Sequence, residues 1–246
     1  MICKLKQLIL RFTPLWVQKK YFTHQRFKTS GKLKAKEVFT DIYKNNEWGK
    51  PDSTDHLFYS GSGSHTIDGV LTYVNAVAAF TQTFDKKLNA VDLGCGDFAV
   101  GSKVRKYFDD YIACDVVEAL IEFNKEKYMT LNVNFIEMDI ITEELPLGDL
   151  VFLRQVLQHL SNKQISQIIH KLKSKYQYLV ITEHLPMSKN FKPNKDKPQG
   201  PDIRLGVNSG VVLSMPPFNL KVLNQTILCE VEEGNGIIQT LVYQLY

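Results

Sequence analysis

Two glycines and an acid follow a short apolar run in the segment AVDLGCGDFAVG, residues 90–101. The pattern Gly94-x-Gly96-x-x-Ala99 predicts a tight turn from a buried strand into a helix, where the backbone approaches a ligand closely. This spacing fits a dinucleotide-binding turn with alanine in the place of the third glycine. Asp92 precedes the first glycine by two residues, and its charge suggests a different nucleoside.

An acidic residue also stands at the end of each of the next two predicted strands. Asp115 ends a strand predicted over 111–115, where an acid in a doubly wound sheet comes within reach of ribose hydroxyls. That position fits NAD and S-adenosylmethionine equally, because both contain adenosine. Asp139 ends a strand predicted over 133–139, and its carboxylate could accept a hydrogen bond from an adenine amino group.

The charge beside the glycines separates these two cofactors. A pyrophosphate is anionic and favours the amides of a helix N-terminus without a neighbouring carboxylate. The ammonium group of a methionine moiety favours a nearby carboxylate, which Asp92 provides. The acids therefore favour S-adenosylmethionine, and an NAD-dependent oxidoreductase remains the alternative.

Strands and helices alternate along the chain and must position these side chains. The alternation predicts an α/β fold with a doubly wound, mostly parallel sheet. A turn around 234–236 closes the chain with an antiparallel hairpin, which completes an expected seven-stranded sheet. The five strands before the hairpin are predicted over 88–93, 111–115, 133–139, 149–153 and 178–182.

Two helices and one loop have more specific patterns. The helix after residue 66 should bury Ile67, Val70, Leu71, Val74 and Ala78, which share one face. Another helix should begin with a capping box of a serine and a glutamine at residues 161 and 164. The proline-rich segment 185–218 is expected to be a long loop that acts as a lid or binding element.

Several motifs together resemble the class I S-adenosylmethionine-dependent methyltransferases. They are VDLGCGDF, the acid at the end of YIACD, EMDI and DLVFLRQVLQHL, and the resemblance spans roughly residues 60–246. The stretches VFTDIYKNNEWG, SGSGSH and PPFNL are similar to a bacterial subgroup of these enzymes whose substrates are often unassigned. The resemblance implies a Rossmann-like methyltransferase fold and methyl transfer from S-adenosyl-L-methionine.

The resemblance also implies roles for individual residues. Asp92 would lie near the methionine ammonium group, Asp115 at the ribose hydroxyls and Asp139 at the adenine amino group. The other residues implied in the cofactor site are Gly94, Cys95, Gly96, Val116, Ile140 and Leu153. Phe98 stands where the fuller family pattern has a third glycine, and it is expected to crowd one side of the cofactor.

The candidate catalytic residues follow the fourth and fifth strands. Methyl transfer needs an aligned acceptor, and a hydroxyl acceptor must also lose its proton. His159, Glu183, His184 and, in the glycine-serine loop, His65 are candidates for the general base. Arg154 could bind an anionic acceptor. Two structural alternatives remain open: His159 could orient the following helix, and Arg154 could belong to an ion pair.

The predicted reaction is O-methylation of a small-molecule, glycan or lipid-linked acceptor. No NPPY-like motif is present, which disfavours methylation of an adenine or glutamine amide. The four cysteines form no CxxC pair, so no metal site is expected. The loop SGSGSH, residues 60–65, is expected to fold over the methionine moiety as a lid, with an ordinary linker as the alternative.

The first 36 residues contain eight Lys and two Arg and no acid, whereas the whole chain has a net charge of +4. We divide the chain into a basic leader and helix, 1–50, and a methyltransferase domain, 51–246. The leader could pack loosely on the domain, or it could lie on anionic lipid with Leu10, Phe12 and Trp16 as anchors.

The apolar run of the leader is too short to span a bilayer, and no signal-peptide pattern precedes it. Nucleic acid is disfavoured as a partner because no recognition motif accompanies the charge. We expect a cytoplasmic protein, with peripheral contact to the inner face of the membrane as the role that the basic leader offers. A non-catalytic methyltransferase-fold protein tethered by this arm is a further alternative.

Overall fold

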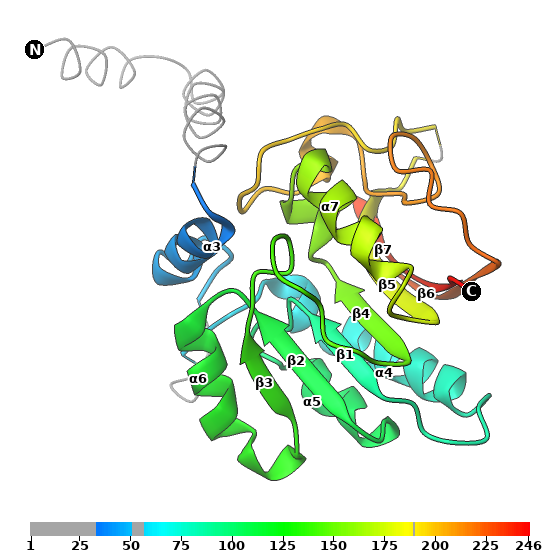
Figure 1. Cartoon of the computed structure of the whole chain (residues 1–246). Coiled ribbons are helices and arrows are strands. Elements are labelled where there is room, and N and C mark those ends of the chain that lie inside the picture. The colour runs from blue at the N-terminus through cyan, green and yellow to red at the C-terminus, as the bar shows by residue number, and fades with distance from the viewer. Residues whose placement is uncertain (1–32, 51–56, 189) are drawn as a thin grey trace, which may run out of the picture.

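A seven-stranded sheet with the order β3-β2-β1-β4-β5-β7-β6 forms the centre of the molecule (Figure 1). The computed structural model describes residues 33–50, 57–188 and 190–246. The first five strands are parallel, and β7 pairs antiparallel with both β5 and β6. This confirms the predicted fold class. The strands are β1 (Ala90–Leu93), β2 (Tyr111–Asp115), β3 (Asn134–Glu137), β4 (Leu150–Arg154), β5 (Tyr178–Pro186), β6 (Asn224–Glu233) and β7 (Gly236–Gln244).

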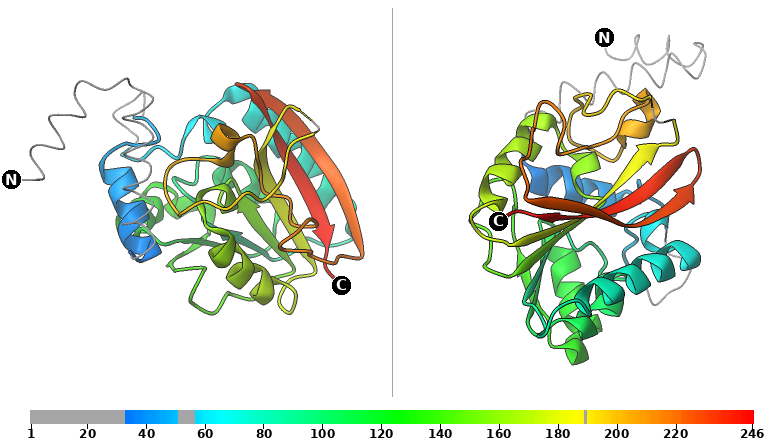
Figure 2. Two further views of the ribbon diagram at one scale, coloured as in Figure 1. Left: turned by 90° about the horizontal axis from the view of Figure 1, so that it is seen from above. Right: turned by 90° about the vertical axis from the view of Figure 1, so that its right-hand side faces the viewer.

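Helices cover both faces of the sheet, as two further views show (Figure 2). The α-helices are α3 (Ala35–Lys44), α4 (Ile67–Thr81), α5 (Gly101–Val104), α6 (Glu118–Lys127) and α7 (Asn162–Leu172). Five 3-10 turns connect them among the described residues: η1 (Ser62–Ser64), η2 (Arg105–Tyr107), η3 (Met129–Leu131), η4 (Leu157–His159) and η5 (Arg204–Val207).

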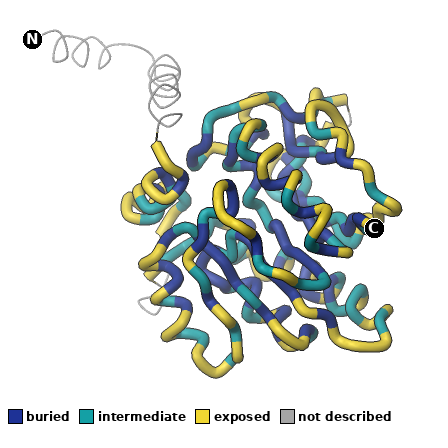
Figure 3. Tube along the Cα trace, viewed as in Figure 1, coloured by how far each residue is buried: buried dark blue, intermediate teal, exposed yellow. Residues whose placement is uncertain are grey.

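Buried residues concentrate along the strands (Figure 3), and the buried side chains form two layers that the strands separate. Phe152 of β4 packs in the layer that contains α4, and the next residue, Leu153, packs in the layer that contains α7. This alternation follows from the strand geometry, which points successive side chains to opposite faces. Both faces of β4 are therefore covered, which explains its continuous hydrophobic run.

The α7 prediction is confirmed, and the predicted face of α4 is partly wrong. Ser161 and Gln164 form the capping box of α7. In α4, however, Ile67 and Leu71 are 81% and 55% exposed, while Tyr73 is buried. The helix turns Tyr73 inward because its ring lies under the guanidinium of Arg154, which is 5.1 Å from the ring centroid.

The segment between β5 and β6 is a long connection, as predicted, and it packs against η4. Arg204 is almost fully buried, and its guanidinium donates hydrogen bonds to the carbonyls of Leu157, Gln158 and Leu160. One side chain thereby binds two carbonyl groups of η4 and the carbonyl group of the residue that follows it. The loop therefore fixes the turn that carries His159.

The helix α3 is tied to the rest of the fold by polar and apolar contacts. Lys36 Nζ donates to Glu118 Oε2 at 3.1 Å and also contacts Glu137. The proposed boundary at residue 50 remains a prediction. Residues 1–32, which include the predicted lipid anchors, lie outside the described residues. None of the helices in the described ranges has the length and apolar character needed to cross a bilayer.

Candidate active site

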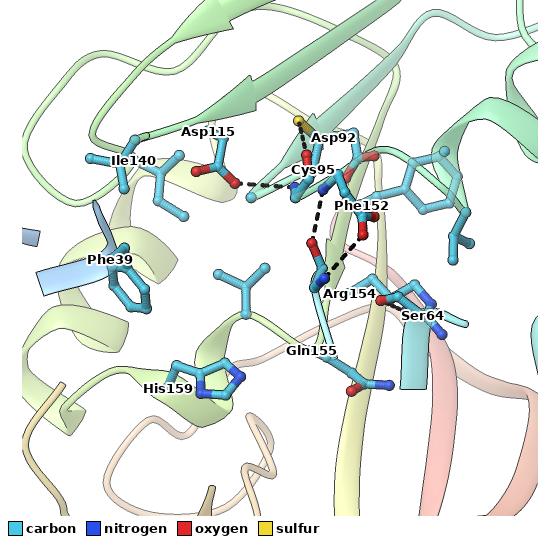
Figure 4. Close-up of a pocket in the computed structure, with 18 of the residues that line it drawn as sticks. Phe39, Ser64, Asp92, Cys95, Asp115, Ile140, Phe152, Arg154, Gln155 and His159 are labelled. Carbon is cyan, nitrogen blue, oxygen red and sulfur yellow. Dashed lines mark hydrogen bonds between the residues drawn. The ribbon is translucent and has the colours of Figure 1, made fainter. Parts of the chain in front are cut away.

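A cavity of about 130 Å³ opens at the carboxyl ends of β1, β2 and β4 (Figure 4). Its walls come from the turn after β1, the ends of β2 and β4, the segment after β3, α3 and the loop that precedes α4. In an open α/β sheet, ligands bind outside the carboxyl ends of the strands, where the strand order reverses. Here that point lies between β1 and β4.

The glycine turn lines this cavity and has the predicted conformation. Gly94 and Gly96 have φ angles of +79° and +57°. A Cβ atom at Gly94 would lie 2.6 Å from Val156 Cγ2, and one at Gly96 would lie 2.5 Å from Ser60 Oγ. Both glycines are therefore required by backbone conformation and by the space beside the cavity. Cys95, between them, also lines it.

Phe98 does not crowd the cavity, contrary to the expectation from the sequence. It has the positive φ angle, +56°, that the missing glycine would have provided. Its ring is fully buried and packs edge-on against Phe135 at 4.9 Å and Tyr111 at 5.7 Å. The cost of a left-handed backbone at a bulky residue is offset by this burial.

Asp92 lines the cavity and is nearly buried. The hydroxyl of Tyr111 donates to its Oδ2 at 3.2 Å. Burial raises the pKa of Asp92 to about 7, although the Tyr111 hydrogen bond and the nearby Arg154 charge act in the opposite direction. A cation placed beside Asp92 would relieve the cost of burying its charge.

Asp115 and Asp139 open onto the same cavity as Asp92. The amides of Gly96 and Val117 donate to the two oxygens of Asp115, each at 3.1 Å. Burial raises the pKa of Asp115 to about 6 despite these bonds. Asp139 accepts hydrogen bonds from the Ile141 amide and the Thr142 hydroxyl, which fix its orientation. Val116 and Ile140 lie beside these acids in the lining.

The loop before α4 is fastened to the glycine turn by Asp97, which the sequence analysis did not select. Ser60 N donates to Asp97 Oδ2 at 3.0 Å, and Asp97 N donates to Ser60 Oγ at 2.8 Å. His65 Nε2 lies 2.6 Å from Asp97 Oδ2, so His65 belongs to this fastening. In the sequence, the only indication of this contact between loop and turn is that an acid directly follows the second glycine.

Arg154 lines the cavity but is engaged by the same loop. Its Nη1 donates to Ser64 Oγ at 3.1 Å, and its Nη2 donates to the carbonyl of Gly63. Both partners are neutral groups, so these contacts give Arg154 a structural role without the ion pair that was named as its alternative. Ser60 and Ser64 also line the cavity, so the loop lies at its edge as the lid prediction requires. The lid itself remains a prediction.

His159 lines the cavity on the side opposite Asp115 (Figure 4). Its Nδ1–H donates to the carbonyl of Gly200 at 3.2 Å, which leaves Nε2 as the ring's acceptor atom, and the side-chain nitrogen of Gln158 lies 3.4 Å from that Nε2. The ring centroid lies 4.9 Å from that of Trp48, whose Nε1–H donates to the carbonyl of Pro201. Burial, assisted by the charge of Lys197, lowers the pKa of His159 to about 3, so the ring is neutral.

Leu153, Glu183 and His184 are absent from the cavity lining. Leu153 follows Phe152 and precedes Arg154, which both line the cavity, and therefore points to the other face. Strand β5 continues past the cavity to Pro186, so Glu183 and His184 lie within the sheet. His184 Nε2 donates to the Glu233 carbonyl, and buried Glu183 faces the charge of Arg204.

Several lining residues were not predicted individually, and for three of them the only sequence signal is the resemblance of the stretch VFTDIYKNNEWG to a methyltransferase subgroup. Phe39, Tyr43 and Trp48 come from α3 and the turn after it, far from the glycine motif in sequence. Gln155 lines the cavity at the end of β4 with a φ angle of +56°. Non-glycine residues with such angles gather at functional sites. Aromatic residues on an amphipathic helix look like core residues, so only the folded arrangement reveals their position.

Comparisons with known proteins give a consistent result. Residues 90–175 match the sequence model of a family described as a methyltransferase domain. No curated protein matches the chain by sequence. The solved structures that resemble it include magnesium protoporphyrin IX methyltransferase ChlM from Synechocystis PCC 6803 with bound S-adenosylhomocysteine. It has a TM-score of 0.54 and 15% identity, with 85% of this chain and 99% of that chain covered.

Two other structures show the same fold. The N-methyltransferase NodS from Bradyrhizobium japonicum WM9, in complex with S-adenosyl-L-homocysteine, has a TM-score of 0.51 and 14% identity, covering 70% of this chain and 84% of that chain. Human N-acetylserotonin methyltransferase in complex with SAM has a TM-score of 0.52 and 14% identity, covering 89% of this chain and 61% of that chain. Residues 90–175 therefore match a methyltransferase domain, and the chain has the fold of solved methyltransferases that bind S-adenosylmethionine or S-adenosylhomocysteine.

Proposed function

We propose that the protein transfers a methyl group from S-adenosylmethionine to a hydroxyl group of a small-molecule, glycan or lipid-linked acceptor. The observation that carries this proposal is the meeting of Asp92, Asp115, Asp139 and His159 in one cavity. The acids come from three successive strand ends and would bind the cofactor. His159 lies on the opposite side, where the acceptor would approach.

The residues of the cavity fit the cofactor. Gly94 and Gly96 line the cavity, and a Cβ atom at either position would collide with the side chain of Val156 or Ser60 at the same wall, so glycine keeps the backbone close to the ligand space. Asp92 has one hydrogen-bond donor, Tyr111, and can accept from an ammonium group as well. Four acids and one arginine line the cavity, which disfavours the diphosphate of NAD. When bound, S-adenosylmethionine would supply an electrophilic methyl group.

The neutral His159 ring suits a hydroxyl acceptor. Its Nε2 would accept the acceptor's O–H proton as a hydrogen bond and so orient an oxygen lone pair. A ring with a pKa of about 3 is a weak base toward a free hydroxyl. The acceptor oxygen becomes acidic as its new bond to the methyl carbon forms. The His159 ring is a strong enough base to remove the proton from that oxygen. His159 thus orients first and removes the proton late.

The localisation and membrane contact belong to the same proposal. The protein would act in the cytoplasm, with residues 1–36 in contact with the anionic inner face of the membrane. The concentration of ten basic residues without an acid in that segment supports this. This membrane contact would bring the cavity close to a lipid-linked acceptor.

A thermal-shift comparison of S-adenosylhomocysteine, NADH and buffer tests the cofactor. We expect S-adenosylhomocysteine alone to raise the melting temperature, because a ligand that binds the native state stabilises it. A rise with NADH alone would favour the oxidoreductase, and no rise with either would favour a non-catalytic protein. Methyl transfer from labelled cofactor to hydroxyl acceptors, lost in His159→Phe while the thermal shift is kept, tests the chemistry.

A further inference from the structure

The wall of the cavity around His159 differs from the wall that carries the acids. Trp48, Phe39, Val156 and Leu160 line the cavity together with His159. The Trp48 ring lies 4.9 Å from the His159 ring and 6.2 Å from the Phe39 ring. A wall of this kind favours a flat apolar ligand, because aromatic faces stack and bury a large area.

This wall is held rigidly by one turn of the long loop. The carbonyls of Gly200 and Pro201 accept hydrogen bonds from His159 Nδ1 and Trp48 Nε1, respectively. The Gly200 amide also donates to the carbonyl of His159 at 3.0 Å. Two adjacent loop residues therefore fix both rings, and the tautomer of His159 with them. Nε2 of His159 can therefore only accept a hydrogen bond. The Gln158 side-chain amide lies 3.4 Å from it and 3.4 Å from Gln155 Oε1, so an acceptor hydroxyl would replace one long contact of that amide.

Charge around the cavity further restricts the ligand. Asp92, Asp97, Asp115 and Asp139 line it, and the guanidinium of Arg154 is engaged by Ser64 and Gly63. The four carboxylates outnumber the one guanidinium of the described lining, which disfavours an anionic acceptor. A cationic acceptor group at His159 would in turn face Lys197 and Arg204, whose positive charges both act on that ring.

We infer that the acceptor is a neutral hydroxylated aromatic compound, which stacks on Trp48 and donates its hydroxyl hydrogen bond to His159 Nε2. This inference rests on the proposed function and narrows its acceptor to one chemical class. Glycans and lipid-linked acceptors without an aromatic ring become outcomes that count against it. Trp48 is then a residue that determines acceptor specificity.

Four naphthalene derivatives of nearly equal shape test the inference. They are 2-naphthol, 2-methoxynaphthalene, 2-naphthoate and 2-naphthylmethylammonium, each titrated at pH 7 into protein saturated with S-adenosylhomocysteine. We expect 2-naphthol to bind at least tenfold more tightly than each of the others. The methoxy compound lacks the donor, and a site built for a hydroxyl rejects such analogues. The other two compounds carry charges that the wall disfavours.

Two variants and a control connect the binding to the named residues. Trp48→Leu should weaken 2-naphthol binding at least fivefold, and His159→Phe should remove the difference between 2-naphthol and 2-methoxynaphthalene. Both variants should keep S-adenosylhomocysteine affinity within about twofold, which shows that they fold. Tyr246→Leu, at an exposed aromatic residue, should change none of these values.

Three results would overturn the inference. They are equal binding of 2-naphthol and 2-methoxynaphthalene, preference for a charged derivative, and no detectable binding of 2-naphthol. Failure of S-adenosylhomocysteine to bind would instead overturn the proposed function. In that event the same four titrations on the free protein still decide whether the aromatic wall selects a neutral hydroxyl.

Discussion

Asp92 is the buried acid that we propose to bind the methionine ammonium group of the cofactor. Its carboxylate has Tyr111 as hydrogen-bond donor and lies in a cavity where burial disfavours its charge. Substitution with asparagine keeps the shape and removes that charge. We expect Asp92→Asn to weaken S-adenosylhomocysteine binding about 10–100-fold, since hydrogen bonds to charged groups contribute about 1.5–3 kcal/mol. Isothermal titration calorimetry measures the change.

Asp109→Asn is a matched control, because Asp109 is exposed and does not line the cavity. Equal affinities for the two variants would contradict the role of Asp92.

The pH dependence of S-adenosylhomocysteine binding gives a second check on Asp92. The raised pKa, about 7, keeps Asp92 neutral at lower pH. Binding of the ammonium group should therefore tighten as the pH rises through 7 in the natural protein and less so in Asp92→Asn.

At the scale of elements, the turn between β1 and α5 depends on the contact between Phe98 and Gly101. A Cβ atom at Gly101 would lie 2.2 Å from Phe98 Cε2, whereas Gly206 in η5 has no atom within 4 Å of that position. We expect Gly101→Ala to lower the free energy of unfolding by about 1–3 kcal/mol through overpacking. Gly206→Ala should change it by less than about 0.5 kcal/mol. Urea denaturation of the two variants compares them, and equal stabilities would refute the packing argument.

The loop before α4 is the second element whose role can be tested. Ser60 Oγ accepts from the Asp97 amide and lies 2.8 Å from the Tyr43 hydroxyl, so it connects the loop to the glycine turn and to α3. Ser60→Ala removes both contacts. If the loop covers the cofactor, S-adenosylhomocysteine affinity should fall about 3–10-fold, the effect of one or two neutral hydrogen bonds. Ser174→Ala on the exposed surface is the control, and an unchanged affinity in Ser60→Ala would identify the loop as a linker.

The stability of the whole molecule should depend on pH through Glu183. Burial raises the pKa of Glu183 from 4.5 to about 8, although the positive charge of Arg204 opposes this. The folded state therefore holds this proton more tightly than the unfolded state. The resulting stability is fully present below pH 4.5 and is lost as the pH rises through about 8.

Glu183→Gln removes this titration and serves as the comparison. We expect the natural protein to lose stability relative to the variant by up to about 1.4 kcal/mol per pH unit between pH 5 and 8. Urea denaturation at four pH values measures the difference in free energy of unfolding between the two proteins. Contributions from other titrating groups cancel in this difference. Parallel curves for the two proteins would show that Glu183 is ionised throughout this range.

The sequence by itself determined the order of the elements and the positions of the acids. Strand alternation, the glycine turn and the capping box of α7 are local patterns, and each depends on residues close together in the chain. Each of Asp92, Asp115 and Asp139 lies at or just after the end of a strand, and these positions follow from periodicity in the chain. Parallel pairing of the strands then brings the three acids to one edge of the sheet.

Only the tertiary structure decided which side chains meet in the cavity. The length of β5 depends on its pairing with β7, and this removes Glu183 and His184 from the candidate site. Trp48 is held beside His159 by its hydrogen bond to the carbonyl of Pro201. These two hydrogen-bonded residues are 153 positions apart in the chain. Contacts over such separations depend on how elements pack, which local patterns in the chain do not encode.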